Sequence, residues 1–368
     1  MLSANRYFSD DYFEARRSFI STVQAASGRL ESFSHPSFGP NGEELATDVA
    51  EFGPTQANNA LFVCSATHGI EGFAGSAVQI GLIHEGWQKR LPEETKLVLI
   101  HAINPYGFAF LRRFDENNVD LNRNFFEPDQ ERPENRGYDT LAKWIAPKSI
   151  SPISEFNAFL RLLLFAAGHG TSATRKAVTG GQYRHPDGLF YGGESKSWSA
   201  TTLETVIKNY SEGVSRAIFF DIHTGLGPNC AAEMISNSPK DSAQYIRAHA
   251  IWGDMLKTTK ADESVSADLT GTLKLAVIKT LPNVEVTAAS IEFGTVPVLV
   301  ALRALRAENW LHHAGDVRDP RAKRIKRNLL AAFNPDSDRW RENVWKEGCA
   351  AVEKSINWLA AKSKGTEP

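Results

Sequence analysis

Three side chains with the chemistry of metal ligands stand where two apolar segments of the sequence end. His68 and Glu71 follow the apolar run 59–66, and His223 follows the run 217–222. A catalytic zinc ion takes three protein ligands, drawn from His, Asp and Glu, and leaves a fourth position to water. In the alternative interpretation, His68 and Glu71 cap a helix and complement its dipole while His223 is a hydrogen-bonded core residue. Spacing and position leave both interpretations open.

Two carboxylates belong to the same strand ends. Asp221 lies two residues before His223, so their side chains share a face of the strand. A zinc-bound histidine usually donates its second ring N–H to such a carboxylate. Glu292 lies between the apolar residues Ile291 and Phe293, where an unpaired carboxylate is costly, and we expect it to act as the general base of a hydrolysis. The alternatives are a structural ion pair for Glu292 and no role in the site for Asp221.

The segment 111–126, LRRFDENNVDLNRNFF, is crowded with charged and amide side chains. The planar fork of an arginine suits a carboxylate, and a neighbouring asparagine adds a donor. Asn122 and Arg123 are therefore interpreted as a clamp for a substrate carboxylate, with Arg112 or Arg113 free to polarise a carbonyl. The alternative is a solvated loop with internal ion pairs.

Strand and helix patterns alternate along the chain and predict how these residues are positioned. Strands are predicted at 45–52, 59–66, 97–103, 217–222 and 288–293. Helices are predicted at 10–26, 72–90 and 154–167. Apolar strands separated by helices predict an α/β fold, with a mixed, mainly parallel central sheet and helices on both faces. Ligands bind beyond the carboxyl ends of the strands in such sheets, and the candidate residues gather at those ends.

The longest irregular region is predicted at 128–193, and its Gly-rich part, 168–193, is expected to set the size of the pocket. No shift in composition marks a domain boundary. We therefore expect a single catalytic domain over 1–368, with its motifs in 59–295 and a helical C-terminal extension over 297–368.

Composition restricts the class of protein. The 368 residues are 42% apolar and 23% charged, which predicts a globular fold, and the net charge of −2 lacks the basic excess that nucleic-acid binding needs. Cys64, Cys230 and Cys349 lie too far apart for a thiolate metal site or a disulfide framework. Because the first residues lack a secretory apolar stretch and no apolar run reaches ~18 residues, we expect a cytoplasmic protein without a membrane partner. No Gly-x-Ser-x-Gly elbow follows a strand, which disfavours serine hydrolysis.

The candidate residues also form a recognisable order along the chain. That order is His68-x-x-Glu71, Arg113, Asp120-Leu121-Asn122-Arg123-Asn124-Phe125, His223 and Glu292. It resembles the zinc carboxypeptidase superfamily, in particular a bacterial branch of unknown function, and the resemblance spans about 59–295. The succinylglutamate desuccinylase and aspartoacylase group is a more distant relative that shares the Asp-Leu-Asn-Arg signature.

The resemblance implies a zinc site and a hydrolytic mechanism. It implies that His68, Glu71 and His223 hold one Zn²⁺ per chain. It implies further that Glu292 activates a water molecule and that Arg113 stabilises the developing oxyanion.

The resemblance also implies how a substrate is bound. Asn122 and Arg123 would bind the free carboxylate of the substrate, and the neighbouring Arg112 is retained as a further substrate-binding residue. A mobile tyrosine closes over the substrate in digestive carboxypeptidases, and Tyr191 is the candidate for a similar role here.

The predicted activity is zinc-dependent hydrolysis of an amide bond next to a free carboxylate. A metallocarboxypeptidase acting on peptides is the first interpretation. An N-acyl amino acid deacylase is the alternative, and both need the same residues. A non-catalytic binding protein on the same fold is the third; it would be expected to lack a ligand or the base, and neither is missing from the sequence.

Overall fold

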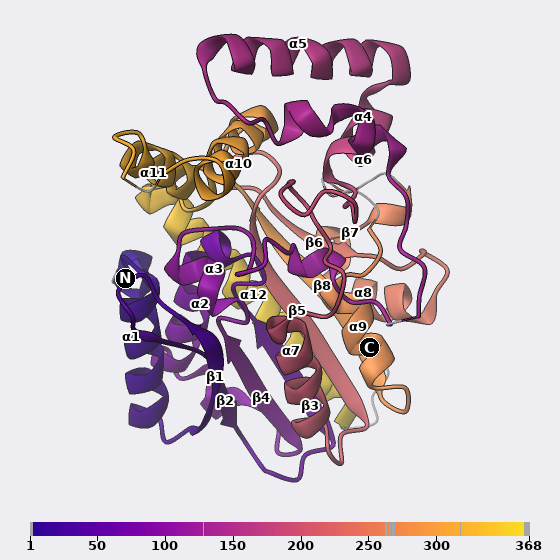
Figure 1. Cartoon of the computed structure of the whole chain (residues 1–368). Helices are drawn as coiled ribbons and strands as arrows, with labels where there is room; N and C mark the ends of the chain where they lie inside the picture. The colour runs from indigo at the N-terminus through magenta and orange to yellow at the C-terminus, as the bar shows by residue number, and fades with distance from the viewer. Residues whose placement is uncertain are drawn as a thin grey trace.

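A single eight-stranded sheet forms the centre of the protein (Figure 1). The computed structural model describes residues 3–127, 129–261, 264, 266, 269–316 and 318–363. In chain order the strands are β1 (Arg29–Phe38), β2 (Glu44–Phe52), β3 (Asn59–Cys64), β4 (Thr95–His101), β5 (Arg216–Gly225), β6 (Ala232–Ser236), β7 (Leu256–Thr258) and β8 (Glu285–Gly294). They lie side by side in the order β1-β2-β4-β3-β5-β8-β6-β7.

The middle of this sheet is parallel and its flanks are mixed. β3 pairs in parallel with β4 and β5, and β5 pairs in parallel with β8. β1 and β2 continue the sheet antiparallel on one side, whereas β6 pairs antiparallel with β8 and parallel with β7 on the other. Every residue of β3 and β4 is buried, because parallel strands are covered on both faces. The predicted mixed, mainly parallel sheet is confirmed.

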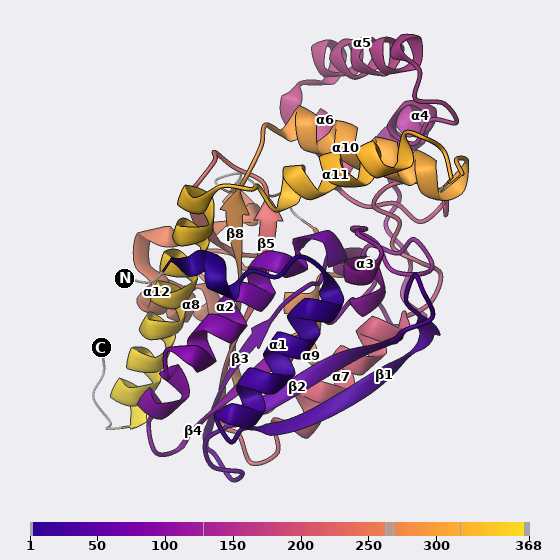
Figure 2. The same ribbon diagram turned by 90° about the vertical axis from the view of Figure 1, so that its left-hand side faces the viewer.

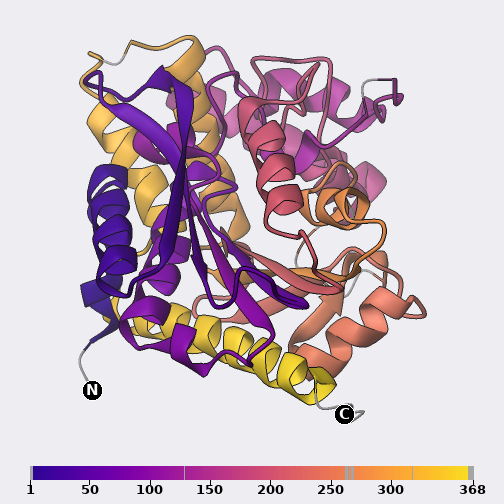
Figure 3. The ribbon, with the colours of Figure 1, turned by 90° about the horizontal axis from the view of Figure 1, so that it is seen from below.

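Helices cover both faces of the sheet. The α-helices are α1 (Tyr12–Ala25), α2 (Gly72–His84), α3 (Pro105–Ala109), α4 (Arg136–Ile145), α5 (Pro152–His169), α6 (Thr171–Thr179), α7 (Trp198–Asn209), α8 (Ala243–Trp252), α9 (Leu273–Thr280), α10 (Val298–His313), α11 (Ala322–Phe333) and α12 (Asp338–Ser363). α1, α2, α8 and α12 pack on one face in a core that includes Trp252 and Trp340, and α7 and α9 pack on the other around Leu203 and Val277. Figure 3 shows the sheet between α12 and α7.

A third apolar cluster stands at the carboxyl edge of the parallel strands. Tyr138 of α4, Val178 of α6, Leu305 of α10 and Leu329 of α11 pack together there. Figure 2 shows α10 and α11 lying across this edge, with α5 outermost. In the part of the chain that the structure describes, no helix combines the length and the apolar character needed to cross a bilayer.

Several elements were not among the predicted strands and helices, including α4 in the region 128–193, and two of them are instructive. β1 lies between the predicted helix 10–26 and the predicted strand 45–52, where no strand was predicted, because most of its side chains are exposed or half-buried and so lack the apolar pattern of a core strand. α6 lies within the predicted Gly-rich loop 168–193, where Gly170 and Gly180 flank a short helix. Residues 364–368 of the predicted C-terminal extension lie outside the described residues.

Candidate functional site

The strand ends bring the predicted metal-ligating residues to one edge of the sheet. His68 follows β3 and precedes a short 3-10 helix that ends at Glu71. His223 of β5 lies directly opposite Glu292 of β8 in the parallel register. The chain can turn closely after β3 because residue 69 is glycine: a Cβ atom on Gly69 would lie 2.0 Å from a backbone atom of α3.

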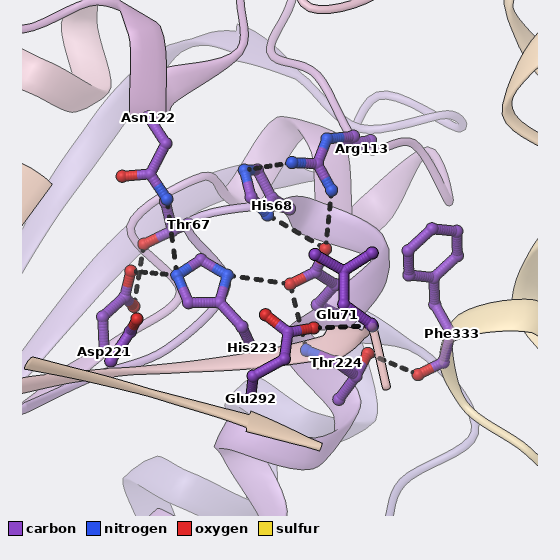
Figure 4. A network of polar contacts seen from close by, with 12 residues as sticks. Thr67, His68, Glu71, Arg113, Asn122, Asp221, His223, Thr224, Glu292 and Phe333 are labelled. Carbon is purple, nitrogen blue, oxygen red and sulfur yellow. Dashed lines mark hydrogen bonds and ion pairs between the residues drawn. The ribbon is translucent and has the colours of Figure 1, made fainter. Parts of the chain in front are cut away.

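Two neighbouring histidine rings each face one oxygen of the carboxylate of Glu71 (Figure 4). The Nδ1 atom of His68 lies 2.9 Å from Oε1 of Glu71, and the Nδ1 atom of His223 lies 2.9 Å from Oε2. One ligand atom from each residue falls within 4.8 Å of the others, and all three residues are buried. The structure therefore brings His68, Glu71 and His223 together as the sequence predicted.

The second nitrogen of each ring faces another carboxylate. Nε2 of His68 lies 3.2 Å from Oδ1 of Asp120, and Nε2 of His223 lies 2.6 Å from Oδ2 of Asp221. The hydroxyl of Thr67 donates to the other oxygen of Asp221 at 2.9 Å. Metal-bound histidines are oriented by such outer carboxylates, so this arrangement, with both Nδ1 atoms facing Glu71, fits a divalent metal ion with a preference for nitrogen and oxygen ligands.

The charges of this cluster shift the pKa values of its members. Burial alone would raise the pKa of Glu71, but His68, His223 and Arg113 outweigh that effect and hold it well below the usual range. Burial would likewise lower the pKa of His223, but Asp221 and Glu71 raise it to about 10. The carboxylates of Glu71 and Asp221 thus favour a positive charge at the position between them.

Arg113 contacts three side chains of the site through its three guanidinium nitrogens. Nη1 donates to Glu71 Oε1 at 2.9 Å and Nε donates to Asp120 Oδ2 at 3.1 Å, while Nη2 lies 2.8 Å from Nε2 of His68. Arg113 also lines the cavity described below, so its guanidinium is held at the cluster and faces the space beside it.

Arg112 points elsewhere, contrary to the prediction that it binds substrate. Its Nε donates to Glu308 of α10 at 2.9 Å and one Nη donates to Asn118 at 2.9 Å. The side chain is 1% exposed and does not line the cavity. The two adjacent arginines therefore face different parts of the molecule, and Arg113 alone contacts the cluster.

Asn122 and Arg123 both line the cavity, as the clamp interpretation expects. The Asn122 side chain accepts from the backbone N–H of Leu273 at 3.1 Å, and its Nδ2 lies 3.4 Å from Nε2 of His223. Arg123 donates to the carbonyl of Thr179 at 2.6 Å, and its Nε atom is buried without a partner among the described residues. An unsatisfied buried donor of this kind is suited to a ligand that accepts a hydrogen bond.

Tyr191 lies behind the cavity rather than over it. Its backbone carbonyl accepts from Asp120 at 2.7 Å, its side chain is 5% exposed, and it is not among the lining residues. The preceding residue, Phe190, lines the cavity instead, with the guanidinium carbons of Arg113 and Arg123 at 5.5 and 5.8 Å from its ring centre. The structure thus does not bring Tyr191 into the site, and it adds Phe190, an apolar residue that carried no chemical signal in the sequence.

Glu292 lines the same cavity from the end of β8. Its Oε1 accepts from the backbone N–H of Leu226 at 2.9 Å, which fixes the carboxylate beside the histidine cluster (Figure 4). Burial, with the negative charge of Glu71 nearby, raises the pKa of Glu292 to about 7. A carboxyl group with this pKa can exchange a proton near neutral pH.

The cavity that joins these residues has a volume of about 480 Å³. Polar residues from the strand ends and from α9 form its floor. Its wall and mouth are apolar and come chiefly from α5, α6 and α10, through Phe159, Leu162, Leu163, Ala166, Val178, Val298, Leu299 and Leu302. The predicted segment 168–193 contributes to the wall, together with α5 and α10. Helical periodicity predicted α5 and did not indicate that it stands over the strand ends.

Comparison with known proteins relates the chain to one family. The model of the family described as "Protein of unknown function (DUF2817)" matches residues 8–347. A search of curated proteins finds no match.

A search of solved structures finds similar chains. Bovine thrombin-activatable fibrinolysis inhibitor, solved with tick carboxypeptidase inhibitor, is 11% identical and superimposes with a TM-score of 0.52 over 97% of this chain and 98% of that one. Carboxypeptidase A from Helicoverpa armigera is 11% identical, with a TM-score of 0.46 over 89% and 75%. A metallo-carboxypeptidase from Pseudomonas aeruginosa is 14% identical, with a TM-score of 0.40 over 86% and 67%. The first likeness confirms a carboxypeptidase-like fold, as the motif order predicted.

Proposed function

The chain belongs to the DUF2817 family of proteins of unknown function, and we propose that it is a zinc-dependent hydrolase of amide bonds that lie next to a free carboxylate. The observation that carries this proposal is the shared cavity of the His68–Glu71–His223 cluster and Glu292. A metal site, a buried carboxyl group with a pKa near 7 and an arginine fork are the parts that metal-assisted hydrolysis requires.

His68, Glu71 and His223 would hold the metal ion. Zinc fits because three nitrogen and oxygen donors face one point and because both rings are backed by carboxylates. When bound, zinc makes a water molecule acidic enough to supply hydroxide near neutral pH and polarises the carbonyl group under attack.

Glu292 is proposed as the proton carrier. Its carboxylate accepts the proton of the attacking water and then delivers it to the leaving nitrogen. The backbone N–H of Leu226 holds one carboxylate oxygen at 2.9 Å, so the other is directed to the reaction. A pKa of about 7 matches both steps, because the group is then neither too weak a base nor too weak an acid at neutral pH.

The arginines are proposed to bind the two charged parts of the substrate. Arg113 donates to the oxygen that becomes negative in the transition state, a kind of interaction worth roughly 3–4 kcal/mol for one donor. Asn122 and Arg123 bind the free carboxylate, and the unpartnered Nε of Arg123 offers it a donor. This clamp would select amides that end in a carboxylate near the bond.

A peptide C-terminus is the first proposed substrate, and an N-acyl amino acid is the second. The second is favoured by one observation: α5 and α10 give the cavity an apolar wall that would suit a hydrocarbon acyl group. Both substrates present the same amide and the same carboxylate, and they differ in what lies on the acyl side of the bond.

A substrate screen with the zinc-loaded protein tests the proposal. Free-carboxylate peptides, the same peptides amidated at the C-terminus, and N-acyl amino acids would be compared for release of free amine. We expect cleavage of free-carboxylate substrates, no cleavage of the amidated ones, and one zinc per chain that is lost in H68A and H223A. Absence of cleavage across the whole panel, or full zinc content in both variants, would refute it.

A further inference from the structure

A buried lysine lies on the floor of the cavity, apart from the residues discussed so far. Lys274 is the second residue of α9, is 8% exposed and lines the cavity. Its Nζ atom donates to the hydroxyl of Ser290 at 2.8 Å and to the carbonyl of Ile235 at 3.1 Å. Ser290 lies two residues before Glu292 on β8, so both face the same side of the sheet. The ammonium group is thereby fixed beside the proposed reaction centre.

Lys274 differs from Arg113 and Arg123 in its partners. Arg113 and Arg123 both contact the carboxylate of Asp120, whereas Lys274 contacts no carboxylate among the described residues. An ammonium group has three donors, and the structure uses two of them. A buried cation without an anionic partner is costly, and that cost falls when an anion binds.

The surroundings of Lys274 support a ligand at this position. Thr272 lines the cavity, and its hydroxyl, which can donate to an anion, is buried without a partner among the described residues. Burial lowers the pKa of Lys274 to about 8, while the more distant Asp221 and Glu292 oppose the shift. The group is therefore still largely charged at neutral pH, and an anion against it would return its pKa toward the usual value.

The same segment touches the proposed carboxylate clamp. The backbone N–H of Leu273, the residue before Lys274, donates to the side chain of Asn122. A carboxylate bound at Asn122 and Arg123 is thus on the same side of the cavity as the ammonium of Lys274. Two anion sites that line one cavity and are linked through adjacent residues of α9 match a ligand with two carboxylates separated by a short carbon chain.

We infer that Lys274 binds a second, side-chain carboxylate of the substrate, so that the preferred leaving group is a dicarboxylic amino acid, aspartate or glutamate. This inference rests on the proposed hydrolase function and specifies the substrate class. The acidic residue is the last residue of a peptide or the amine part of an N-acyl amino acid, and the chemistry that Lys274 recognises is the same in both.

Two matched pairs of substrates test the inference. Zinc-loaded protein would be assayed on acyl-Gly-Glu and acyl-Gly-Gln, and on N-acyl-Glu and N-acyl-Gln, because glutamine keeps the shape of glutamate without its charge. We expect kcat/KM to favour glutamate by about 10- to 100-fold, the range of a hydrogen bond to a charged group. A ratio near one in the wild-type protein overturns the inference, with no variant needed.

Variants on one helix assign the preference to Lys274. K274M should bring the Glu to Gln ratio close to one, mainly by raising KM for the acidic substrates, and K274R should retain most of the preference. K279M makes the same change at an exposed position of α9 and should leave the ratio unaltered. A K274M protein that keeps the preference for glutamate would overturn the assignment.

Binding separates this inference from the proposed function. Calorimetric titration with free glutamate and free glutamine, the two leaving groups, should show tighter binding of glutamate to the wild-type protein and no difference with K274M. If amides are cleaved without regard to charge and the two amino acids bind equally, the hydrolase function stands and the inference fails. If glutamate binds through Lys274 but no amide is cleaved, the hydrolase function fails.

Discussion

At the scale of single residues, the site is a set of side chains that are each held by two or more partners. His68 and His223 both lie between Glu71 and a further carboxylate, and Arg113 contacts the cluster from above. Each side chain is held in its orientation by a neighbour that does not itself face the cavity centre. Changes at the outer partners should therefore act through geometry, and changes at Glu292 should act on the chemical step.

Replacing Glu292 tests that distinction most directly. E292Q keeps the shape of the side chain and removes its capacity to carry a proton, so turnover should fall by about 10²–10⁴-fold while zinc content is retained. The measurement is kcat together with elemental analysis. E285Q, at the exposed start of the same strand, is the matched control and should keep full turnover. An active E292Q protein would remove the proposed proton carrier.

Asp221 should matter for zinc affinity more than for binding of substrate. D221N weakens the contact that orients His223, and loss of such an outer partner typically lowers metal affinity by about 10- to 100-fold. Competition with a chromogenic chelator measures the affinity. D241N, at an exposed position, is the control and should bind zinc as the wild type does. Equal affinities for D221N and wild type would mean that Asp221 does not position the ligand.

Sequence reasoning found the residues of the site better than it found their partners. The spacing of His68 and Glu71, and of Asp221 and His223, is local, so it could be interpreted from the sequence. Asp120 was noticed only as part of a motif, because its contact with His68 joins residues 52 positions apart. Lys274 had no signal at all, since a lysine at the start of a helix is ordinary until the fold buries it in a cavity.

At the scale of elements, the parallel strands carry the chemistry and the helices around them enclose it. The buried strands were predictable because apolar runs of that length have few alternatives, as in β3 and β4. β1 was not, because an edge strand that is partly exposed needs no apolar pattern. α6 was missed because its flanking glycines indicate a loop. The position of α5 over the strand ends depends on tertiary packing, which local patterns do not encode.

The packing of α1 and α2 on β4 should make stability depend on pH. His101 at the end of β4 is buried, stacks on Phe19 of α1 at 4.4 Å, and its Nε2 lies 3.0 Å from the hydroxyl of Ser76 in α2. Burial lowers its pKa to about 4, against the opposing charge of Asp48. Below about pH 6.5, the unfolded state therefore binds a proton at this histidine that the folded state does not bind.

This difference in pKa between the folded and unfolded states makes stability fall as the pH falls. The stability from His101 is complete above pH 6.5 and is lost as the pH falls toward 4, by up to about 3 kcal/mol in the free energy of unfolding. Urea titrations at several pH values measure it. H101Q can still hydrogen bond Ser76 and does not titrate, so its stability should fall less over the same range. Parallel pH profiles for the two proteins would contradict this account.

At the scale of the whole molecule, the N-terminal segment and the start of α12 pack on one core. The backbone N–H of Ala4 donates to Glu342 of α12 at 2.6 Å, and the rings of Tyr7 and Trp345 lie 4.9 Å apart. Trp340 of α12 belongs to the same apolar cluster as α1, α2 and α8. The region that the sequence predicts as an extension thus contributes directly to the core around the sheet.

We propose on this basis that the chain is one folding unit. Scanning calorimetry of the zinc-loaded protein should show a single transition whose calorimetric and van't Hoff enthalpies agree. Removal of α12 takes Trp340 and its neighbours from the core, so a chain ending before Asp338 should not fold cooperatively. Two separate transitions in the full chain would indicate two domains instead.

Metal removal should destabilise the whole molecule and not the site alone. The ligands proposed for zinc lie on β5 and on the turn after β3, so zinc at about 1,000 times its Kd should add about 4 kcal/mol to the free energy of unfolding. Thermal unfolding with zinc, with a chelator, and with zinc restored measures this. H68A should unfold at the same temperature with and without zinc, and a zinc-dependent shift in that variant would place the ion elsewhere.

The division of the cavity into a strand-built floor and a helix-built wall has a consequence for how such a protein can diversify. Substitutions in α5 or α10 change the shape and polarity offered to the acyl side of a substrate without moving His223 or Glu292, which are fixed by the register of β5 and β8. Substrate preference can therefore change in evolution without a change in the residues that are proposed to react. A few helical substitutions could thus change the acyl group that the cavity accepts while the proposed hydrolytic centre stays the same.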